Sequence, residues 1–554
     1  MGERLLTAQF YCIGTCSAAY DVIYTYFILN SHLTTASPQS GPQVRDAAPN
    51  RSGGRSPWAP LAVLCVAVLM VNLDNTILNV ALPTLVEKLR ATTDQLQWIV
   101  DAYSMVFGGL LLVAGSLADR FGRKRLFVAG LIVFGSGSLG AAFSGSVDPL
   151  IAWRALMGAG AAMTIPSGLS IVNDIFRDPA ERARAVGMWA GTIGLGIAVG
   201  PVAGGLLLAH FWWGSVFLVN VPVVAAGLVG TLLLVPESRS ANPRRADPAG
   251  ALLSIGGLGG ILWAIIEGPA HGWSSPEVIA ALVGGVALVA GFVAWEWHSD
   301  HPMLPLRYFR SRRFTIALSA LGLGVFALLG GLFLQTQFLQ FFLGYSPLGA
   351  GLRILPLAAL LALAALASSR LVRRVGSKLI VAAGLLLITG GLAENAAVAT
   401  PTVTYLLALP GMLMIGLGAG LLIPAATDSV LGALGQEDAG VGSAANSTAL
   451  QVGGALGVAV IGSVLSTRYQ SAMNPVLAGR HVPAVAAQAI LGSLGGALAV
   501  AREVGGPLGA GLAAVARNNF EMGTRAALSA AIGVTGAGVL LVLAVLPSRS
   551  RETR

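Results

Sequence analysis

The stretch Gly115-Ser-Leu-Ala-Asp-Arg-Phe-Gly-Arg-Lys124 separates two long apolar segments of the chain. Residues 97–117 lead into it with one charged side chain, and residues 126–147 follow it with none. A hydrocarbon core about 30 Å thick needs roughly 20 mainly apolar residues per helix. Both segments are long enough to cross it, so the charged stretch is predicted to be the turn between two membrane-spanning helices.

The same alternation continues along the chain. Of its 554 residues, 55% are hydrophobic and 11% are charged, whereas soluble domains carry about 25% charged residues. The composition therefore predicts an all-α membrane protein. We expect fourteen spans, near residues 60–80, 97–117, 126–144, 149–170, 186–208, 214–235, 250–267, 278–297, 314–335, 350–369, 379–396, 403–424, 446–466 and 524–547.

Basic residues are concentrated in every second loop between these spans, and the formal net charge is +9. Such loops mark the cytoplasmic side of a membrane, so the charge indicates topology and not a nucleic-acid partner. Because the number of spans is even, we expect both termini in the cytoplasm and the chain in the cell (inner or plasma) membrane. The clusters are Arg120 and Arg123 to Arg125, Arg177 to Arg184, Arg239 to Arg245, Arg307 to Arg313, Arg370 to Lys378, and Arg549 to Arg554.

A degenerate copy of the first motif, Ser368-Ser-Arg-Leu-Val-Arg-Arg-Val-Gly-Ser-Lys378, follows the second of the last six spans. Both end in Arg-x-Gly-x-Lys, although Asp119 becomes Arg373 in the copy. Duplicated halves are a recurrent plan among transporters. We therefore expect two six-helix bundles with two inserted central helices, divided as 58–240, 241–312 and 313–547, and then a cytoplasmic tail at 548–554.

Two further segments differ from this core. Residues 1–57 hold an aromatic-rich run, Phe10 to Leu29, and then a Ser/Pro/Gly/Arg linker. A fifteenth span there would reverse the orientation that the basic loops demand, so we prefer a poorly ordered leader and linker. Residues 467–523 are rich in alanine and glycine, and we expect an outside loop with one or two short amphipathic helices.

Three charged residues of the first half, Asp74, Asp101 and Arg154, fall inside or at the edge of predicted spans. A charge at the centre of a span costs about 2.5–3.5 kcal/mol, so these side chains must pair, face an aqueous cavity, or both. One interpretation is a purely structural ion pair. We prefer a proton and cation site, because a carboxylate out of water has its charged form disfavoured and a bound organic cation would favour it.

Asp101 has neighbours suited to a cation. Trp98 at i−3 and Met105 at i+4 lie on the same helix face, and aromatic rings attract cations through their π-faces. The alternative for Trp98 is a place in the aromatic belt at the membrane surface. Asp74 lies in the polar run Asn72 to Thr76, which we expect to face the interior of the bundle.

The fifth span carries a run of glycines from Gly191 to Gly205, interrupted by Pro201. Small residues allow helices to approach closely, and proline bends a helix. Ordinary tight packing would account for the run as well.

Motifs for other chemistry are lacking. ATP hydrolysis would need a G-x-x-x-x-G-K-[S/T] loop, which the sequence does not contain, and we find no nucleophile–base pair or metal-ligand set. The three cysteines, Cys12, Cys16 and Cys65, indicate neither a metal site nor a disulfide framework. We therefore expect no enzyme activity, no cofactor and no metal.

Several motifs in order resemble those of the fourteen-span drug/proton antiporters of the major facilitator superfamily, and among them the QacA-like and LfrA-like multidrug exporters. The similarity extends to about residue 465 and leaves residues 1–57 uncovered. The motifs are Leu73 to Pro83, Gln97 to Tyr103, Gly115 to Lys124, Arg154 to Gly160, Gly196 to Gly205, Phe217 to Pro222, Tyr345 to Gly351 and Gln451 to Ala459.

The resemblance implies the major facilitator fold and a proton-coupled antiporter that exports cationic, lipophilic drugs, dyes or quaternary ammonium compounds by alternating access. Its partners would be these small molecules, protons and membrane lipid, and the chain would act as a monomer. The resemblance also assigns roles to three sets of residues. Asp74 and Asp101 would bind proton or substrate, tuned by Arg154; Gly115, Asp119, Arg120, Gly122 and Arg123 would form a cytoplasmic latch stabilising the outward-open state; and Gly196, Gly200, Pro201, Gly204 and Gly205 would form the antiporter motif.

Other functions stay open. The same motifs fit export of a natural product or lipid precursor made by the cell, and the fold also permits solute import, although the fifth-span motif is typical of exporters. A membrane enzyme or sensor would need a catalytic set or an appended soluble domain. Some relatives carry acids near the positions of Leu361, Asn446 and Ser447, and their absence here puts recognition of divalent cations in doubt.

Overall fold

The computed structural model describes residues 57–547, except residues 177, 240–246, 300–301, 303–304, 401, 435–438 and 479–480. Within these ranges the chain is almost entirely helical and contains no strand. The expected leader, up to residue 56, and the expected tail from residue 548 lie outside the described residues.

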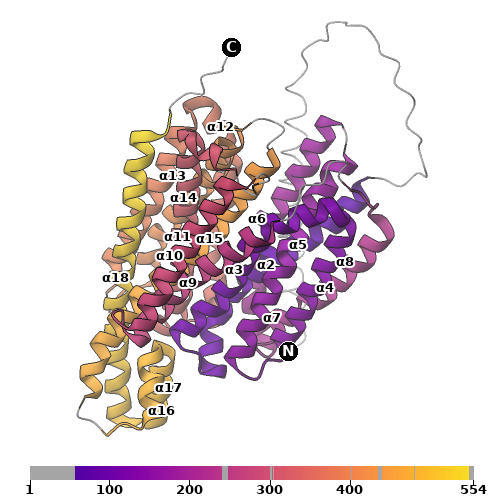
Figure 1. Cartoon of the computed structure of the whole chain (residues 1–554). Coiled ribbons are helices and arrows are strands. Elements are labelled where there is room, and N and C mark those ends of the chain that lie inside the picture. The colour runs from indigo at the N-terminus through magenta and orange to yellow at the C-terminus, as the bar shows by residue number, and fades with distance from the viewer. Residues whose placement is uncertain are drawn as a thin grey trace, which may run out of the picture. The chain divides into compact units, whose positions relative to one another are not determined.

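The first half of the described chain consists of helices drawn in indigo and purple in Figure 1. A single turn, α7 (Ser215–Leu218), leads into α8 (Asn220–Leu234), and the two together form one apolar span. The other helices are α2 (Trp58–Leu89), α3 (Thr93–Phe121), α4 (Arg123–Ala142), α5 (Val147–Ile175) and α6 (Pro179–His210).

Two helices, α9 (Pro248–His271) and α10 (Pro276–His298), separate this half from the next. A short 3-10 turn, η1 (Leu306–Arg310), then leads into the second half. Its long helices are α11 (Arg312–Gln337), which continues as the π-turn η2 (Phe338–Phe342), α12 (Pro347–Val375), α13 (Ser377–Val398), α14 (Tyr405–Leu431), α15 (Ala439–Leu477) and α18 (Gly506–Val545), with the short helices α16 (Ala484–Gly492) and α17 (Leu494–Val504) before the last.

The two copies of the charged motif form the same sharp turn. Gly122 lies between α3 and α4 with φ +112°, and Gly376 lies between α12 and α13 with φ +89°. Residues with a side chain rarely adopt such values, whereas glycine adopts them at no steric cost. The glycine shared by both copies therefore allows one helix to end and the next to begin without a connecting loop.

Helix packing repeats between the halves. In the first half α2 packs on α6 and α8, α3 packs on α5, and α4 packs on α5 and α8. In the second half α11 packs on α15 and α18, α12 packs on α14, and α13 packs on α14 and α18. Each half thus uses the same order of partners, which confirms the duplication that the repeated motif predicted.

Twelve helices among the described residues are long and apolar enough to cross a membrane. α3 is bent by 52° between Leu111 and Val113. When its two parts are counted as one span, α3 is the thirteenth helix that could cross a membrane. α6 occupies the remaining position with 32 residues, of which Val199–His210 form a short apolar segment. Each predicted span therefore coincides with a helix, and the prediction of an all-α membrane protein is confirmed.

The helices end at two opposite sides. We call the side that carries the Gly122 and Gly376 turns, with their arginines, the basic end, and the side that carries α16 and α17 the hairpin end. The structure differs from the expected outside loop at 467–523, because α15 continues to Leu477 and α18 begins at Gly506. The two short helices lie in the interval that remains.

Polar contacts join the two halves toward the hairpin end. Gln340 Nε2, on η2, donates to the carbonyl of Val80 on α2 at 2.9 Å. Thr93 Oγ1, at the start of α3, donates to the carbonyl of Gly492 at the end of α16, also at 2.9 Å. The structure is therefore a state in which the halves meet at the hairpin end.

Candidate functional site

Asp74 on α2 and Arg154 on α5 form an ion pair inside the first half. Arg154 Nη1 donates to Asp74 Oδ2 at 2.6 Å, and the side chains of Arg154 and Asp74 are 0% and 1% exposed. A buried charge is tolerated when a partner of opposite sign and further hydrogen bonds satisfy it. The pairing that the sequence left open is thus present for these two residues.

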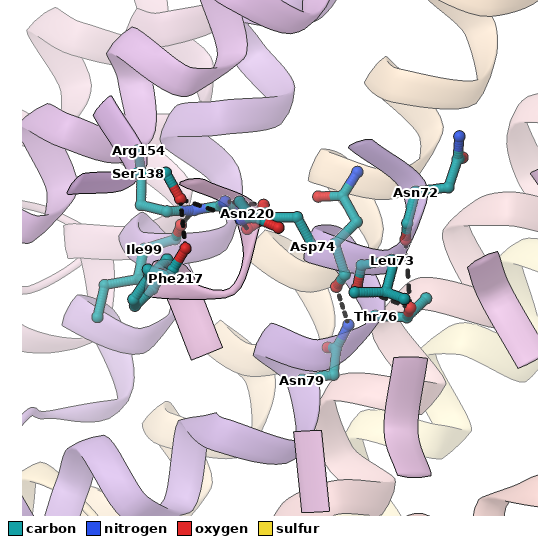
Figure 2. A network of polar contacts seen from close by, with 11 residues as sticks. Asn72, Leu73, Asp74, Thr76, Asn79, Ile99, Ser138, Arg154, Phe217 and Asn220 are labelled. Carbon is teal, nitrogen blue, oxygen red and sulfur yellow. Dashed lines mark hydrogen bonds and ion pairs between the residues drawn. The ribbon is translucent and has the colours of Figure 1, made fainter. Parts of the chain in front are cut away.

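Asn220 bonds to the second oxygen of Asp74 and is itself bonded to Ser138 (Figure 2). Asn220 Nδ2, at the start of α8, donates to Asp74 Oδ1 at 2.8 Å and to Ser138 Oγ at 3.0 Å. The hydroxyl of Ser138 on α4 donates a hydrogen bond to the carbonyl of Phe217 at 2.8 Å. Both oxygens of Asp74 therefore accept a hydrogen bond. We did not predict Asn220 as a site residue, although an amide inside the motif Phe217 to Pro222 was the available signal.

Arg154 is positioned by α3. Its Nε donates to the carbonyl of Ile99 at 3.0 Å, and its guanidinium carbon lies 4.4 Å from the centroid of the Tyr103 ring. A methyl group at Gly158 would lie 2.4 Å from the carbonyl oxygen of Tyr103. Because Gly158 follows Arg154 by one turn, the Arg-x-x-x-Gly motif brings the backbones of α5 and α3 close enough for the arginine to reach both partners.

Asp101 is different from Asp74. It is 0% exposed, and neither carboxylate oxygen has a hydrogen-bond partner among the described residues. An ionised carboxylate in such a place is costly unless it is paired, whereas a protonated one or one beside a bound cation is not. The structure therefore separates the two acids by their partners, since in the part of the chain that it describes Asp74 is paired and Asp101 is not.

The side chains around Asp101 on α3 show which way it faces. Gln97, one turn earlier, donates from Nε2 to the carbonyl of Ala459 on α15 at 2.8 Å. A methyl group placed at Gly108, two turns after Asp101, would lie 3.1 Å from Cβ of Gln451, which is also on α15. Residues at i−4 and i+7 share a face with residue i, so Asp101 faces α15 of the second half.

Trp98 and Met105 flank Asp101 on α3, and both contact α9. Trp98 Nε1 donates to Glu267 Oε1 at 2.9 Å. Met105 Sδ would lie 3.1 Å from a methyl group at Gly259. We did not predict Glu267 as a site residue, because it stood at the end of a predicted span where a charged residue is ordinary.

The glycines of α6 serve two contacts. Toward α2, a methyl group at Gly200 would lie 1.8 Å from Thr76 Oγ1, and Thr76 Oγ1 also donates to the carbonyl of Gly196 at 3.1 Å. Toward α12, a methyl group at Gly205 would lie 2.6 Å from the Cα of Leu348. The same stretch therefore packs within its own half and against the other half, which ordinary packing inside one bundle would not require. The remaining motif residues are Pro201, whose carbonyl oxygen lies 2.2 Å from a methyl group placed at Gly351, and Gly204, which packs on Ile77.

The predicted latch is a set of ion pairs at the basic end. Arg123 donates to Asp119 Oδ1 from both Nε and Nη2, at 3.1 and 2.9 Å, and pairs with Asp174 at the end of α5 through Nη1. Arg120 is exposed, with its guanidinium 5.5 Å from the Phe121 ring. A methyl group at Gly115 would meet nothing within 4 Å. We did not predict Asp174 as a site residue, because no pattern in the sequence indicates that the ends of α3 and α5 meet.

Acidic residues are also present in the second half, where we expected few. Glu521 on α18 is 7% exposed, with Arg525 at 3.5 Å, and Glu394 on α13 has a buried oxygen, Oε2, without a hydrogen-bond partner among the described residues. Across the described ranges, no three His, Cys, Asp or Glu side chains are grouped so as to hold a metal.

Comparison with known proteins shows which family this chain resembles. Residues 64–458 match the family model described as Major Facilitator Superfamily. The chain is 36% identical to the multidrug efflux pump LfrA of Mycolicibacterium smegmatis, over 84% of this chain and 92% of that protein. It is 33% identical to the tetracenomycin C resistance and export protein of Streptomyces glaucescens, over 77% and 80%. Its fold is similar to a crystal structure of a bacterial homologue of the human lysosomal transporter Spinster, with a TM-score of 0.63 over 90% and 99% of the two chains at 17% identity.

Proposed function

This chain belongs to the Major Facilitator Superfamily, and on that premise we propose that it exports cationic, lipophilic drugs, dyes or quaternary ammonium compounds in exchange for protons. It is a multi-pass protein of the cell membrane. Export of small molecules is supported by relatives named as a multidrug efflux pump and as an antibiotic resistance and export protein.

The observation that carries the proton coupling is the carboxylate of Asp101. It is fully buried, has no hydrogen-bond partner among the described residues, and faces the second half of the protein. A carboxylate so placed is stable when it carries a proton or when an organic cation lies beside it. One group can therefore exchange a proton for a cationic substrate.

The geometry supports a division of roles between the two acids. Asp74 accepts hydrogen bonds from Arg154 and Asn220, so its charge is already balanced within the first half. Asp101 has no such partner. We assign the exchanged proton to Asp101 and a structural, orienting role to the Asp74–Arg154 pair.

Topology follows from the basic end. Loops rich in Lys and Arg remain in the cytoplasm, so we place the basic end and both termini there and the hairpin end outside. The contacts of Gln340 and Thr93 across the halves then correspond to a state closed toward the outside. Alternating access requires these contacts to separate when the outside opens. All the residues assigned to proton exchange and to these contacts belong to one chain, so we propose that the protein acts as a monomer.

The latch gives a test of this cycle. The pairs seen here lie within the first half and are already formed while the outside is closed, so we propose that Asp119 gains a further contact with the second half when the basic end closes. Such a partly exposed contact is worth about 0.5–1 kcal/mol, so Asp119→Asn should favour inward-open molecules two- to fivefold. Labelling of single cysteines at both ends measures the shift. Asp148→Asn, an exposed acid at the other end of α5, is the control, and equal labelling of both variants would contradict the latch.

A second candidate is export of an antibiotic or other natural product of the producing cell. The tetracenomycin C relative favours it, since its name joins resistance to export. The residues described above serve either substrate class, because both need a proton-driven change between the two states. A panel of dyes and neutral antibiotics separates the two candidates.

The energy source can be measured directly. In everted membrane vesicles we expect dye uptake to follow the proton gradient. Exchange of one proton for one monovalent dye moves no net charge, so the pH difference drives it, and one pH unit, about 1.4 kcal/mol, sustains a tenfold dye gradient. A protonophore should therefore abolish uptake, while vesicles supplied with an imposed acid interior and no ATP should retain it. Uptake that survives the protonophore and stops only on ATP depletion would refute the proposal.

A further inference from the structure

The first inserted helix, α9, lies against helices of both halves (Figure 1). Glu267 accepts the indole N–H of Trp98 on α3 at 2.9 Å. Two residues earlier, the carbonyl of Ile265 accepts a hydrogen bond from Ser463 Oγ on α15 at 2.5 Å. One turn of α9 is thus bonded through Glu267 to the first half and through Ile265 to the second half. Alternating access must move these two halves apart.

Apolar packing supports the same placement. Leu262 and Ile266 of α9 form a buried cluster with Ala455 and Ala459 of α15, against which Trp98 packs. α10, in contrast, packs on α9 and η1 and is mostly exposed. The inserted pair is therefore joined to the transporter through α9.

α9 also bears on Asp101. Gln97 and Trp98 precede Asp101 on α3; the first is bonded to α15 and the second to α9. Met105, one turn after Asp101, lies against Gly259 of α9. The seam between α9 and α15 is therefore the surface that Asp101 faces, and the two helices together close it.

We propose that α9 is a component of the outer gate and that Glu267 is its positioning residue, which holds α9 across α3 and α15 through Trp98 and so keeps Asp101 shielded while the outside is closed. The inference rests on the proposed alternating-access function, and it assigns to the inserted helix a role in the transport cycle. Glu267 acts through Trp98 and need not touch the substrate.

The carboxylate of Glu267 is suited to this role. Its side chain is 16% exposed, and His271 lies 3.5 Å from its second oxygen. A hydrogen bond to a charged acceptor is stronger than one between neutral groups. Removing the acceptor should therefore break the contact of α9 with α3 while leaving the contacts of α9 with α15 in place.

The test uses a protein without Cys12, Cys16 and Cys65, with one cysteine at Ala459, purified in lipid nanodiscs. Ala459 is 0% exposed at the seam, so a polar thiol reagent reaches it only when the gate opens. Glu267→Leu should speed labelling about tenfold, the equilibrium ratio that one charge-assisted hydrogen bond sustains. Trp98→Phe should do the same, and the double variant should be no faster than either single one.

Two controls separate position from charge. Glu267→Gln keeps an acceptor oxygen without the charge, so its labelling rate should lie between those of the unsubstituted protein and Glu267→Leu. Glu277→Leu removes an exposed acid of α10 and should have no effect. Should Glu267→Leu fail to fold, Trp98→Phe carries the comparison. Labelling of Glu267→Leu or of Trp98→Phe at the unsubstituted rate, or equal acceleration by Glu277→Leu, would overturn the inference. Absence of proton-driven uptake by the unsubstituted protein would instead refute the proposed function, which the labelling does not measure.

Discussion

Arg154→Met is expected to destabilise the first half more than any other single change considered for this chain. The substitution leaves Asp74 buried with Asn220 as its remaining partner. Removing one member of a buried ion pair costs about 3–5 kcal/mol, because the other charge stays out of water without compensation. The cation–π contact with Tyr103 is lost as well. An unfolding entropy of about 2 cal/mol/K per residue gives a chain of this length about 1 °C per kcal/mol, so thermal unfolding of the detergent-solubilised protein should show a midpoint lower by roughly 3–5 °C.

A second substitution distinguishes the effect of an unpaired Asp74 charge from the effect of losing the Arg154 side chain. Asp74→Asn added to Arg154→Met removes the stranded charge, and such neutral replacements of buried pairs are often tolerated. The double variant should therefore recover most of the lost stability. Arg374→Met, an exposed arginine at the basic end, serves as the matched control. If Arg154→Met unfolded at the same temperature as this control, the ion pair would not hold the first half together.

Asp101→Asn is expected to have the largest effect on transport. Asparagine has nearly the shape of aspartate, and the carboxylate makes no described hydrogen bond that would be lost, so folding should be unchanged. Without an exchangeable proton, however, dye uptake into everted vesicles should fall more than tenfold. Dye-for-dye exchange at equal concentrations needs no proton and should persist.

Asp94→Asn provides the control for Asp101→Asn. Asp94 stands on the same helix, two turns earlier and partly exposed, so its replacement alters the charge of α3 without touching the buried carboxylate. Uptake by this variant should match the unsubstituted protein. Equal losses in both variants would show that the charge of the helix matters and not the proton on Asp101.

Local patterns in the sequence predicted the helices and their turns. The Arg-x-Gly-x-Lys endings predicted the turns at Gly122 and Gly376. A backbone position with positive φ favours glycine whatever surrounds it, so the sequence displays such a turn directly. The four-residue spacing of Arg154 and Gly158 likewise places both residues on one helix face. Each of these features depends on residues within about one turn, which a sequence displays directly.

Contacts between distant segments were harder to predict. Asp74 and Asp101 both look like acids inside spans, and only the positions of α5 and α8 decide that Asp74 is paired while Asp101 is not. The aromatic residue three positions before Asp101 suggested a cation site, yet Trp98 bonds to Glu267 more than 160 residues later in the chain. The roles of such residues depend on tertiary packing that no periodicity records.

Proton release on substrate binding tests the central claim most directly. The purified protein is placed in weakly buffered solution slightly above neutral pH, and the pH is followed while a monovalent cationic dye is added. We predict that the unsubstituted protein acidifies the solution in proportion to the dye bound and that Asp94→Asn does the same. Asp101→Asn, at dye concentrations raised to offset the weaker binding that loss of the carboxylate causes, should bind dye without releasing protons. Proton release by Asp101→Asn equal to that of the unsubstituted protein would contradict the account.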